Sequence, residues 1–255
     1  MSKPPKPVSA QPTALIVGAS SGVGAALARR LSLEGYALGL VARRIDRLQD
    51  LCDELTSAYY IRAFAYQHDV LNTVEVPALL DRITRDLGQI DLFIYCAGVL
   101  FPNDPTAYHA DEDQFTLRVN LIGAAAWINP VAQYFQQQHT GHIVGIGSIA
   151  GDRGRRGMPA YTASKAGMHT YLEGMRNRLW RDGVTVTTIK LGQVETDMLK
   201  NADRRRSPIT PERAADLIWQ AIKQRKQTVY VPSWWRWIGL GIQYLPSFVF
   251  RRLNI

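Results

Sequence analysis

Short aliphatic runs alternate with longer amphipathic stretches along most of the chain, and this alternation most limits the folds open to the sequence. It is typical of repeated βα units, in which helices cover a buried parallel sheet. The predicted strands are Ala14–Val17, Ala37–Val41, Ile61–Ala65, Leu92–Tyr95, His142–Ile146, Val184–Lys190 and Thr228–Val231. The predicted helices are Gly24–Leu33, Leu48–Ala58, Val74–Leu87, Gln114–Gln137, Ala160–Arg181 and Pro211–Gln224. We therefore expect an α/β fold with one doubly wound parallel sheet of about seven strands.

The length of the chain and the distribution of its charges indicate one domain with two basic ends. A chain of 255 residues is within the range of a single α/β domain. We expect a flexible Pro-rich leader over 1–12, one α/β domain over 13–231 and an amphipathic extension of that domain over 232–255. The net charge of +8 comes from the ends, because 13–216 holds 22 basic and 22 acidic residues. A neutral body argues against a nucleic-acid-binding protein.

Nothing in the sequence indicates export, a disulfide scaffold or a metal site. The leader has no apolar run long enough for a signal peptide or an anchor. We interpret Cys52 and Cys96 as reduced, buried small hydrophobic residues, with a redox role as the alternative. A cytoplasmic protein is expected, and peripheral association with a membrane through the extension is left open.

The extension is strongly apolar over Trp234–Phe250, where only Arg236, Gln243 and Pro246 interrupt it. The stretch is shorter than a membrane span usually requires. Its wide apolar face must still be covered, either by the substrate cleft, by another subunit or by a lipid surface. Burial within the protein is the preferred interpretation.

A glycine loop follows the first predicted strand and leads directly into the first predicted helix. Glycines permit a tight turn and a close approach of the backbone to a pyrophosphate, and free N–H groups at a helix start favour negative charge. Strand, loop and helix in this order predict a Rossmann-like dinucleotide site, with an ordinary tight connection as the alternative. The residues expected to contact the cofactor here are Gly18, Ser20, Ser21, Gly22, Val23 and Gly24.

The second predicted strand ends in Arg43 and Arg44, where an NAD-selective site would present a carboxylate to the ribose hydroxyls. A guanidinium pairs well with a 2′-phosphate, so we expect NADP(H) to be preferred over NAD(H), with Arg43 as the first candidate. The alternative is that both arginines lie in a solvated turn. After the third strand, Asp69 and Val70 are expected at the adenine, unless Asp69 only caps the next turn.

A serine, a tyrosine and a lysine in the second half of the chain have the spacing of a proton-transfer site. Ser148 ends the fifth strand region, and Tyr161 and Lys165 lie four residues apart, hence on one face of a helix. An ammonium at this distance favours the phenolate and is expected to lower the tyrosine pKa from about 10 toward neutral.

These motifs together resemble the short-chain dehydrogenase/reductase (SDR) superfamily, in its short oxidoreductase branch. The resemblance covers about 13–230 and also includes Ala97 and Gly98 after the fourth strand, and Asn120. It implies an NAD(P)-dependent enzyme that interconverts a ketone or aldehyde and an alcohol, and a dimer or tetramer as the assembly. Ala97 and Gly98 would let the cofactor approach closely.

The resemblance also implies a role for each member of a catalytic set. Tyr161 would be the general acid in reduction and the base in oxidation, and Lys165 would lower its pKa and hold the nicotinamide ribose. Ser148 would hydrogen-bond the substrate carbonyl, and Asn120 would fix a water in a proton relay. Ser148 as a strand cap and Asn120 as a surface group are the alternatives.

Two departures from the family pattern are visible. Tyr95 and Cys96 stand where the family often has two asparagines, and Leu191 stands where a proline usually precedes Gly192. Gly192, Val194 and Thr196 remain as candidates for binding the nicotinamide carboxamide. We expect an active enzyme in spite of both changes.

The substrate is less constrained than the chemistry. Arginines at 153–156 and 204–206 lie where the family has a wall and a lid of the substrate cleft, so they either attract an anionic substrate or are solvated loop charges. Met158, Met198 and the apolar extension favour a hydrophobic or lipid-like ketone. The alternative functions are an NADP(H)-binding sensor and a membrane-surface protein, both without turnover.

Overall fold

The computed structural model describes residues 11–101, 106–201 and 207–253, and the side chains of Lys200 and Asn201 lie outside this description. Within these ranges the chain forms a seven-stranded sheet in the order β3-β2-β1-β4-β5-β6-β7. Every neighbouring pair is parallel. The strands are β1 (Thr13–Val17), β2 (Ala37–Ala42), β3 (Ala63–Gln67), β4 (Leu92–Tyr95), β5 (Gly141–Ser148), β6 (Val184–Leu191) and β7 (Thr228–Val231). The predicted doubly wound parallel sheet is confirmed.

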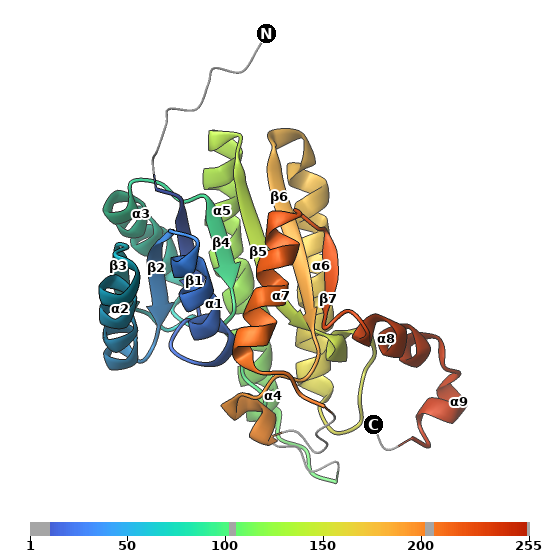
Figure 1. The fold of residues 1–255 in the computed structure, drawn as a ribbon. Coiled ribbons are helices and arrows are strands. Elements are labelled where there is room, and N and C mark those ends of the chain that lie inside the picture. Colours follow the sequence, from blue (N-terminus) through green and yellow to red (C-terminus); the bar gives the residue numbers. More distant parts are fainter. Residues whose placement is uncertain (1–10, 102–105, 202–206, 254–255) are drawn as a thin grey trace.

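Helices cover both faces of the sheet (Figure 1). On one face, α1, α2 and α7 pack against the strands, and on the other face α3, α5 and α6 do so. The bounds are α1 (Gly22–Leu33), α2 (Ile45–Tyr59), α3 (Val76–Leu87), α4 (Ala110–Leu117), α5 (Gly123–Gln138), α6 (Pro159–Leu179), α7 (Pro211–Lys223), α8 (Trp235–Tyr244) and α9 (Ser247–Phe250). Short 3₁₀ turns are η1 (Thr73–Glu75), η3 (Ile149–Asp152), η4 (Trp180–Asp182) and η5 (Asp197–Asn201).

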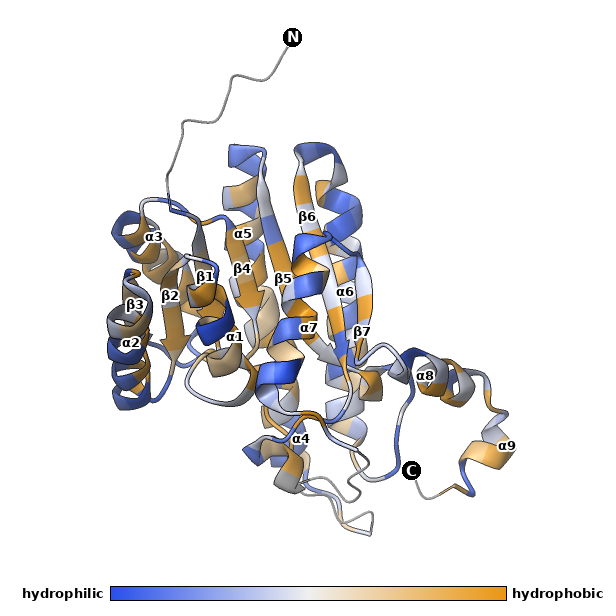
Figure 2. Cartoon of the chain, viewed as in Figure 1, coloured by the Kyte–Doolittle hydropathy of each residue, from blue (hydrophilic) through white to orange (hydrophobic). Residues whose placement is uncertain are grey.

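Alternation along the buried strands builds two hydrophobic cores. In β1, Ala14 and Ile16 join the core beneath α1, α2 and α7, whereas Leu15 and Val17 join the opposite core. Successive side chains of a strand point to opposite faces, so a strand covered on both sides must be apolar throughout. Figure 2 accordingly shows β1, β2 and β4 as mainly hydrophobic ribbons in the centre of the fold.

The order in which strands are added to the sheet reverses between β1 and β4. From β1 the next strands are added toward one edge of the sheet, and from β4 they are added toward the other edge. Crevices outside the carboxyl ends of strands at such a reversal are the usual ligand sites of open α/β sheets. Figure 1 shows α4 and the C-terminal helices near these carboxyl ends. The fold therefore predicts a ligand site at the carboxyl ends of these strands.

Two differences from the sequence-based prediction have a clear local cause. β3 begins at Ala63 instead of Ile61, because Tyr60 adopts the left-handed conformation (φ 54°) that ends α2. The predicted helix Gln114–Gln137 is three pieces, since a π-helical turn, η2 (Arg118–Ile122), separates α4 from α5. Such turns insert extra chain into a helix and are frequent at functional sites.

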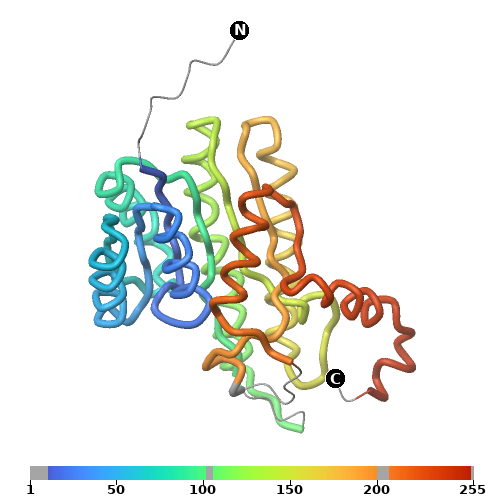
Figure 3. The backbone as a smooth tube through the Cα atoms, viewed as in Figure 1, coloured from blue at the N-terminus to red at the C-terminus, as the bar shows by residue number. Residues whose placement is uncertain are grey.

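The C-terminal segment 232–255, hereafter the tail, leaves the edge of the sheet after β7. Figure 3 shows its backbone running through α8 and α9 away from the strands. Among the described residues, no helix has the length and apolar character needed to cross a membrane.

Candidate active site

A cavity of about 470 Å³ opens at the carboxyl ends of the strands. It runs from the glycine loop after β1, past Ser148 at the end of β5, to Tyr161 and Lys165 on α6. All the residues predicted from the sequence to bind the cofactor or to act in catalysis line it, apart from Asn120. Within the described part of the chain, the fold therefore joins two sets of residues that are more than a hundred positions apart in the sequence.

The glycine loop is held in a conformation that only glycine adopts easily. Gly18 has a φ of +94°, and a Cβ atom on it would lie 2.5 Å from the backbone nitrogen of Ala97. A Cβ atom on Gly24 would lie 2.1 Å from the carbonyl oxygen of Gly18. The loop is thus pressed against both the end of β4 and the start of α1. Ser21 caps α1 without a side-chain hydrogen bond to the helix.

The two arginines after β2 behave differently from each other. Arg44 reaches back to the glycine loop, where its Nη2 donates to the hydroxyls of Ser20 (2.9 Å) and Ser21 (2.8 Å). Arg43 also lines the cavity, but within the described residues its side chain makes no hydrogen bond to the loop. Desolvation, followed by the charges of Arg47 and Arg43, lowers the pKa of Arg44. Clustered guanidinium groups at the cavity wall form a strongly positive region.

Asp69 caps a turn and also lines the cavity. Its Oδ1 accepts a hydrogen bond from the backbone nitrogen of Leu71 at 3.0 Å, so it does cap the turn after β3. Asp69 and Val70 both line the cavity as well. Capping therefore fixes the carboxylate at the wall of the cavity.

Asn120 stands in the π-helical turn and is fully buried. Its Oδ1 accepts from the backbone nitrogen of Val99 (2.8 Å), and its Nδ2 donates to the carbonyl oxygen of Val99 (3.0 Å) and to Ser164 Oγ (3.1 Å). The alternative of a surface position is wrong. The amide thus links Ser164 on α6 to Val99. Val99 lines the cavity together with Ala97 and Gly98, which directly precede it.

Ser148, Tyr161 and Lys165 meet at the other end of the cavity. Ser148 Oγ accepts from the backbone nitrogen of Ala150 at 3.1 Å, and it also hydrogen-bonds Tyr161. Lys165 is buried, and its Nζ donates to the carbonyl oxygen of Ile146 at 3.1 Å and lies 5.7 Å from the centre of the Tyr161 ring. Ser148 at the end of β5 and the pair Tyr161 and Lys165 on α6 therefore line one cavity.

The prediction that Lys165 lowers the pKa of Tyr161 is wrong for this structure. Burial raises the pKa of Tyr161 above its usual 10, and the hydrogen bond to Ser148 and the charge of Arg155 only partly oppose that rise. The ammonium of Lys165 is directed to Ile146 and is itself desolvated, which lowers the pKa of Lys165 to about 8. In this arrangement Tyr161 is a neutral phenol at pH 7.

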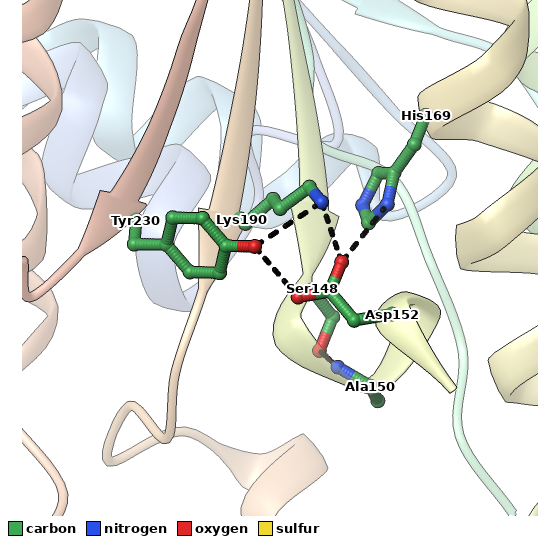
Figure 4. A network of polar contacts seen from close by, with 6 residues as sticks. All are labelled: Ser148, Ala150, Asp152, His169, Lys190 and Tyr230. Carbon is green, nitrogen blue, oxygen red and sulfur yellow. Dashed lines mark hydrogen bonds and ion pairs between the residues drawn. The ribbon is translucent and has the colours of Figure 1, made fainter. Parts of the chain in front are cut away.

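A buried polar cluster beneath Ser148 escaped the sequence analysis (Figure 4). The Asp152 carboxylate, 3% exposed, is 2.5 Å from Lys190 Nζ and accepts from the Tyr230 hydroxyl at 2.9 Å. His169 Nδ1 lies 3.9 Å away, and burial lowers the pKa of His169 to about 4, so this ring is neutral at pH 7. The four side chains come from η3, β6, β7 and α6, and no spacing in the sequence connects them.

The loop after β6 forms another wall of the cavity. Val194 forms a β-bridge with Ile209, and Thr196 Oγ1 donates to the carbonyl oxygen of Val194 at 3.4 Å. A Cβ atom on Gly22 would lie 3.0 Å from the Thr196 methyl group, so this loop also touches the glycine loop. Gly192, Val194 and Thr196 all line the cavity.

The predicted substrate residues are divided between the cavity and other places. Met158, Met198 and Arg155 line the cavity, whereas Arg153 turns to the tail. The arginines at 204–206 lie outside the described residues.

The two cysteines are free thiols, and no cation site is found near them. Burial raises the pKa of Cys52 to about 11 and that of Cys96 to about 12, so both are protonated and unreactive at pH 7. Over the ranges that the structure describes, no group of three or more His, Cys, Asp or Glu side chains could hold a metal ion.

Known proteins resemble this chain in both sequence and structure. The family model described as short chain dehydrogenase matches residues 12–207. An uncharacterized oxidoreductase of Staphylococcus haemolyticus is 31% identical over 212 residues, covering 83% of this chain and 90% of the relative. An uncharacterized oxidoreductase of Mycobacterium tuberculosis is 32% identical over 228 residues, covering 89% of this chain and 90% of the relative.

Solved structures show the same architecture. A short-chain dehydrogenase from Sphingobium yanoikuyae in complex with NADPH superposes with a TM-score of 0.81 at 28% identity, over 90% of this chain and 92% of that one. The actinorhodin polyketide ketoreductase with NADPH has a TM-score of 0.78 at 24% identity, over 87% of this chain and 95% of that one, and supports the fold alone. The family match, the relatives and the geometry of the cavity agree: this chain belongs to the short-chain dehydrogenase/reductase family and is an NAD(P)-dependent oxidoreductase.

Proposed function

We propose that the protein is an NADP(H)-dependent reductase that interconverts a hydrophobic ketone or aldehyde and its alcohol. The observation that carries this proposal is one cavity in which the glycine loop and the Ser148, Tyr161 and Lys165 side chains face a common space. Tyr161 and Ser148 are hydrogen-bonded there, as a proton donor and a carbonyl-binding group need to be.

The residues of the cavity fit a dinucleotide. Gly18 and Gly24 leave no space for a side chain where the pyrophosphate backbone would approach, and the first turn of α1 directs unpaired N–H groups toward it. Val194 and Thr196 line the cavity and are our candidates for holding the carboxamide, and Asp69 and Val70 line it as candidates for holding the adenine. We assign these residues to the cofactor on that basis.

The preference for NADP(H) rests on Arg43 and Arg44. Both line the cavity beside the glycine loop, and Arg44 already contacts the Ser20 and Ser21 hydroxyls, which suits a ribose 2′-phosphate. The structural relative from Sphingobium is in complex with NADPH, which supports this preference. Arg44 thereby becomes a candidate equal to Arg43.

Fluorescence titration of NADPH and NADH tests the cofactor preference. We expect Arg43→Glu and Arg44→Glu each to weaken NADPH binding at least about tenfold, the value of one charge-assisted hydrogen bond lost and a repulsion gained, while NADH binding changes little. Arg47→Glu is the control, because Arg47 is exposed nearby but does not line the cavity. Equal affinities of the wild type for NADPH and NADH would overturn the preference.

Tyr161 supplies the proton in this reaction. When bound, the reduced nicotinamide supplies a hydride to the carbonyl carbon. Tyr161 transfers its phenol proton to the carbonyl oxygen, and in alcohol oxidation it takes that proton back. The phenol is protonated at pH 7, as the acid role requires, while burial raises its pKa and makes it a weaker proton donor than an exposed tyrosine.

The other catalytic residues act around that transfer. The Ser148 hydroxyl holds the carbonyl oxygen, and the Lys165 ammonium holds the nicotinamide ribose. Asn120 orients the segment at Val99 and, in the proposed relay, fixes a water that returns a proton to the site.

Replacement of Tyr161 by phenylalanine tests the mechanism directly. The variant should bind NADPH as the wild type does but lose turnover of a carbonyl panel. Retained turnover would refute the role of Tyr161. Tight NADPH binding by the wild type with no turnover of any aldehyde or ketone would instead support the sensor alternative.

We also propose that the tail contacts an anionic membrane surface. Just before and along α8, the exposed residues Trp234, Trp237, Ile238 and Tyr244 follow helical spacing and form one apolar stripe, with Trp237 73% and Tyr244 78% exposed. Exposed arginines stand beside the stripe and after α9, and residues 217–255 contain no acid. Aromatic rings with cationic neighbours suit lipid headgroups, whereas two such tails would repel each other.

Vesicle flotation of the full chain tests this contact. Trp237→Ser should reduce binding to phosphatidylcholine vesicles that contain phosphatidylglycerol, and vesicles of phosphatidylcholine alone should bind less. Trp180→Ser is a matched control, because Trp180 is 66% exposed and has Arg181 over its ring. Equal flotation of all three proteins would refute the contact.

Assembly into a dimer or tetramer is proposed from the family, in which such assemblies are frequent. Light scattering at several protein concentrations measures the mass directly, and a stable monomer would contradict the proposal.

A further inference from the structure

The tail contributes one aromatic wall to the cavity that contains Ser148 and Tyr161. Trp235, the first residue of α8, is only 6% exposed and lines the same cavity. Its neighbours on the tail differ sharply, since Trp234 is 41% and Trp237 73% exposed. One indole of the tail is therefore directed inward and the others outward.

Trp235 occupies the space that a side chain at Gly192 would need. A Cβ atom on Gly192 would lie 2.0 Å from Trp235 Nε1 and 2.3 Å from its Cδ1, so the indole edge packs directly on the backbone. Gly192 begins the loop that we assign to the nicotinamide carboxamide. The indole N–H finds no acceptor among the described residues, so packing, rather than a hydrogen bond, fixes the ring.

Arg153 holds the tail in this position. It lies five residues after Ser148, and its Nη1 donates to the carbonyl oxygens of Ile242 (2.6 Å) and Leu245 at the end of α8. Its guanidinium also lies 4.1 Å from the centre of the Phe250 ring. The last carbonyls of a helix lack partners within the helix, and a cation there is favourable.

A second contact joins α8 to the same loop. A Cβ atom on Gly239 would lie 3.0 Å from Asp152 Oδ2 and 3.1 Å from the Tyr230 ring, so α8 packs directly over the buried cluster of Figure 4. The η3 turn that follows Ser148 and the helix that carries Trp235 thus form one packed unit.

We propose that Trp235 is a specificity-determining residue of the enzyme, whose indole limits the size of the apolar substituent that a ketone carries on the Gly192 side. Arg153 is a positioning residue that acts through Trp235. Ile149, Met158 and Leu199 also line the cavity, and Met158 is an adaptable side chain, so the indole packed on Gly192 sets the boundary on that side. This inference rests on the proposed reductase function.

The test compares aryl alkyl ketones of increasing alkyl length as substrates of the full-length wild type and of four variants. Trp235→Ala should raise the ratio of kcat/KM for the longest to the shortest ketone by at least about tenfold, the discrimination that one methylene in an apolar pocket commonly gives. Trp235→Phe should give a smaller rise. Trp237→Ala should leave the ratio unchanged, because it removes the same side chain from the outward face.

The affinity for NADPH is measured on the same proteins. A variant that binds NADPH as the wild type does is folded, so a change in its kcat/KM ratio reports a change in substrate selectivity. An unchanged ratio in Trp235→Ala or Trp235→Phe with intact NADPH binding would overturn the inference. Arg153→Lys should shift the ratio in the same direction as Trp235→Phe, and a shift in the opposite direction would count against its positioning role. A wild type that binds NADPH but reduces no ketone would refute the proposed function itself.

Discussion

The buried ammonium of Lys165 is expected to lower the stability of the folded protein, so Lys165→Met should be more stable than the wild type at pH 7. Burial lowers the pKa of Lys165 from 10.5 to about 8. At roughly 1.4 kcal/mol per pKa unit, keeping this group charged in the fold costs about 3 kcal/mol. Loss of the hydrogen bond to Ile146 removes about 1 kcal/mol of that gain. The net expectation is about 2 kcal/mol of added stability.

The sign of this effect fixes its pH dependence. The folded-state pKa of Lys165 lies below the unfolded value, so the wild type has its full stability above pH 10.5 and loses stability as the pH falls to about 8. Lys165→Met has no such dependence. The advantage of the variant should therefore be complete below about pH 8 and should disappear toward pH 10.5.

Urea denaturation followed by circular dichroism, at neutral and alkaline pH without cofactor, measures the difference. Lys226→Met is the matched control, because Lys226 is exposed and its replacement should change the free energy of unfolding little. A lower free energy of unfolding for Lys165→Met than for the wild type at pH 7 would refute the reasoning. The same variant should bind NADPH more weakly, since the proposed contact to the ribose is lost.

Three further substitutions test other parts of the structure. Gly24→Ala should destabilise the protein by about 2 kcal/mol, measured by urea denaturation, because the methyl group would lie 2.1 Å from the Gly18 carbonyl oxygen; an unchanged stability would contradict this. Asp152→Ala should lower the free energy of unfolding by about 3 kcal/mol, because Lys190 would lose its buried partner. His142→Gln should flatten the fall of the melting temperature between about pH 6.5 and 4, because burial lowers the pKa of His142 to about 4 and the wild type loses stability through that window. An identical acid dependence in His142→Gln would show that the histidine does not contribute.

Local patterns predicted most of the fold and much of the site. The strand ends, the glycine spacing after β1 and the four-residue step from Tyr161 to Lys165 are short-range features, which a linear sequence displays directly. The placement of Asn120 could not be predicted, because its π-helical turn depends on packing between α4, α5 and α6. Residue types alone indicated the family role of Asn120, but not its bonds to Val99.

Contacts between distant segments account for what the sequence did not reveal. The tail was expected to bury its apolar face, but nothing in 232–255 indicated that Trp235 would turn inward while Trp237 stayed outside. Arg153 was expected at the cleft wall, and its actual partners are carbonyls about ninety residues later. The pKa of Tyr161 was predicted in the wrong direction, because helical spacing gives the distance to Lys165 and not the desolvation of either group.

The π-helical turn at 118–122 also fixes the number of residues that can lie between α4 and α5. A regular helix turns by about 100° with each residue, so deleting one residue here would rotate α4 by that angle relative to α5. Thr116 would leave the interior, or the amide of Asn120 would leave Val99, and no change of side chain would restore both. Insertions and deletions in this segment should therefore be rejected even where single substitutions are accepted, so relatives should agree here in the number of residues more strictly than in their identity.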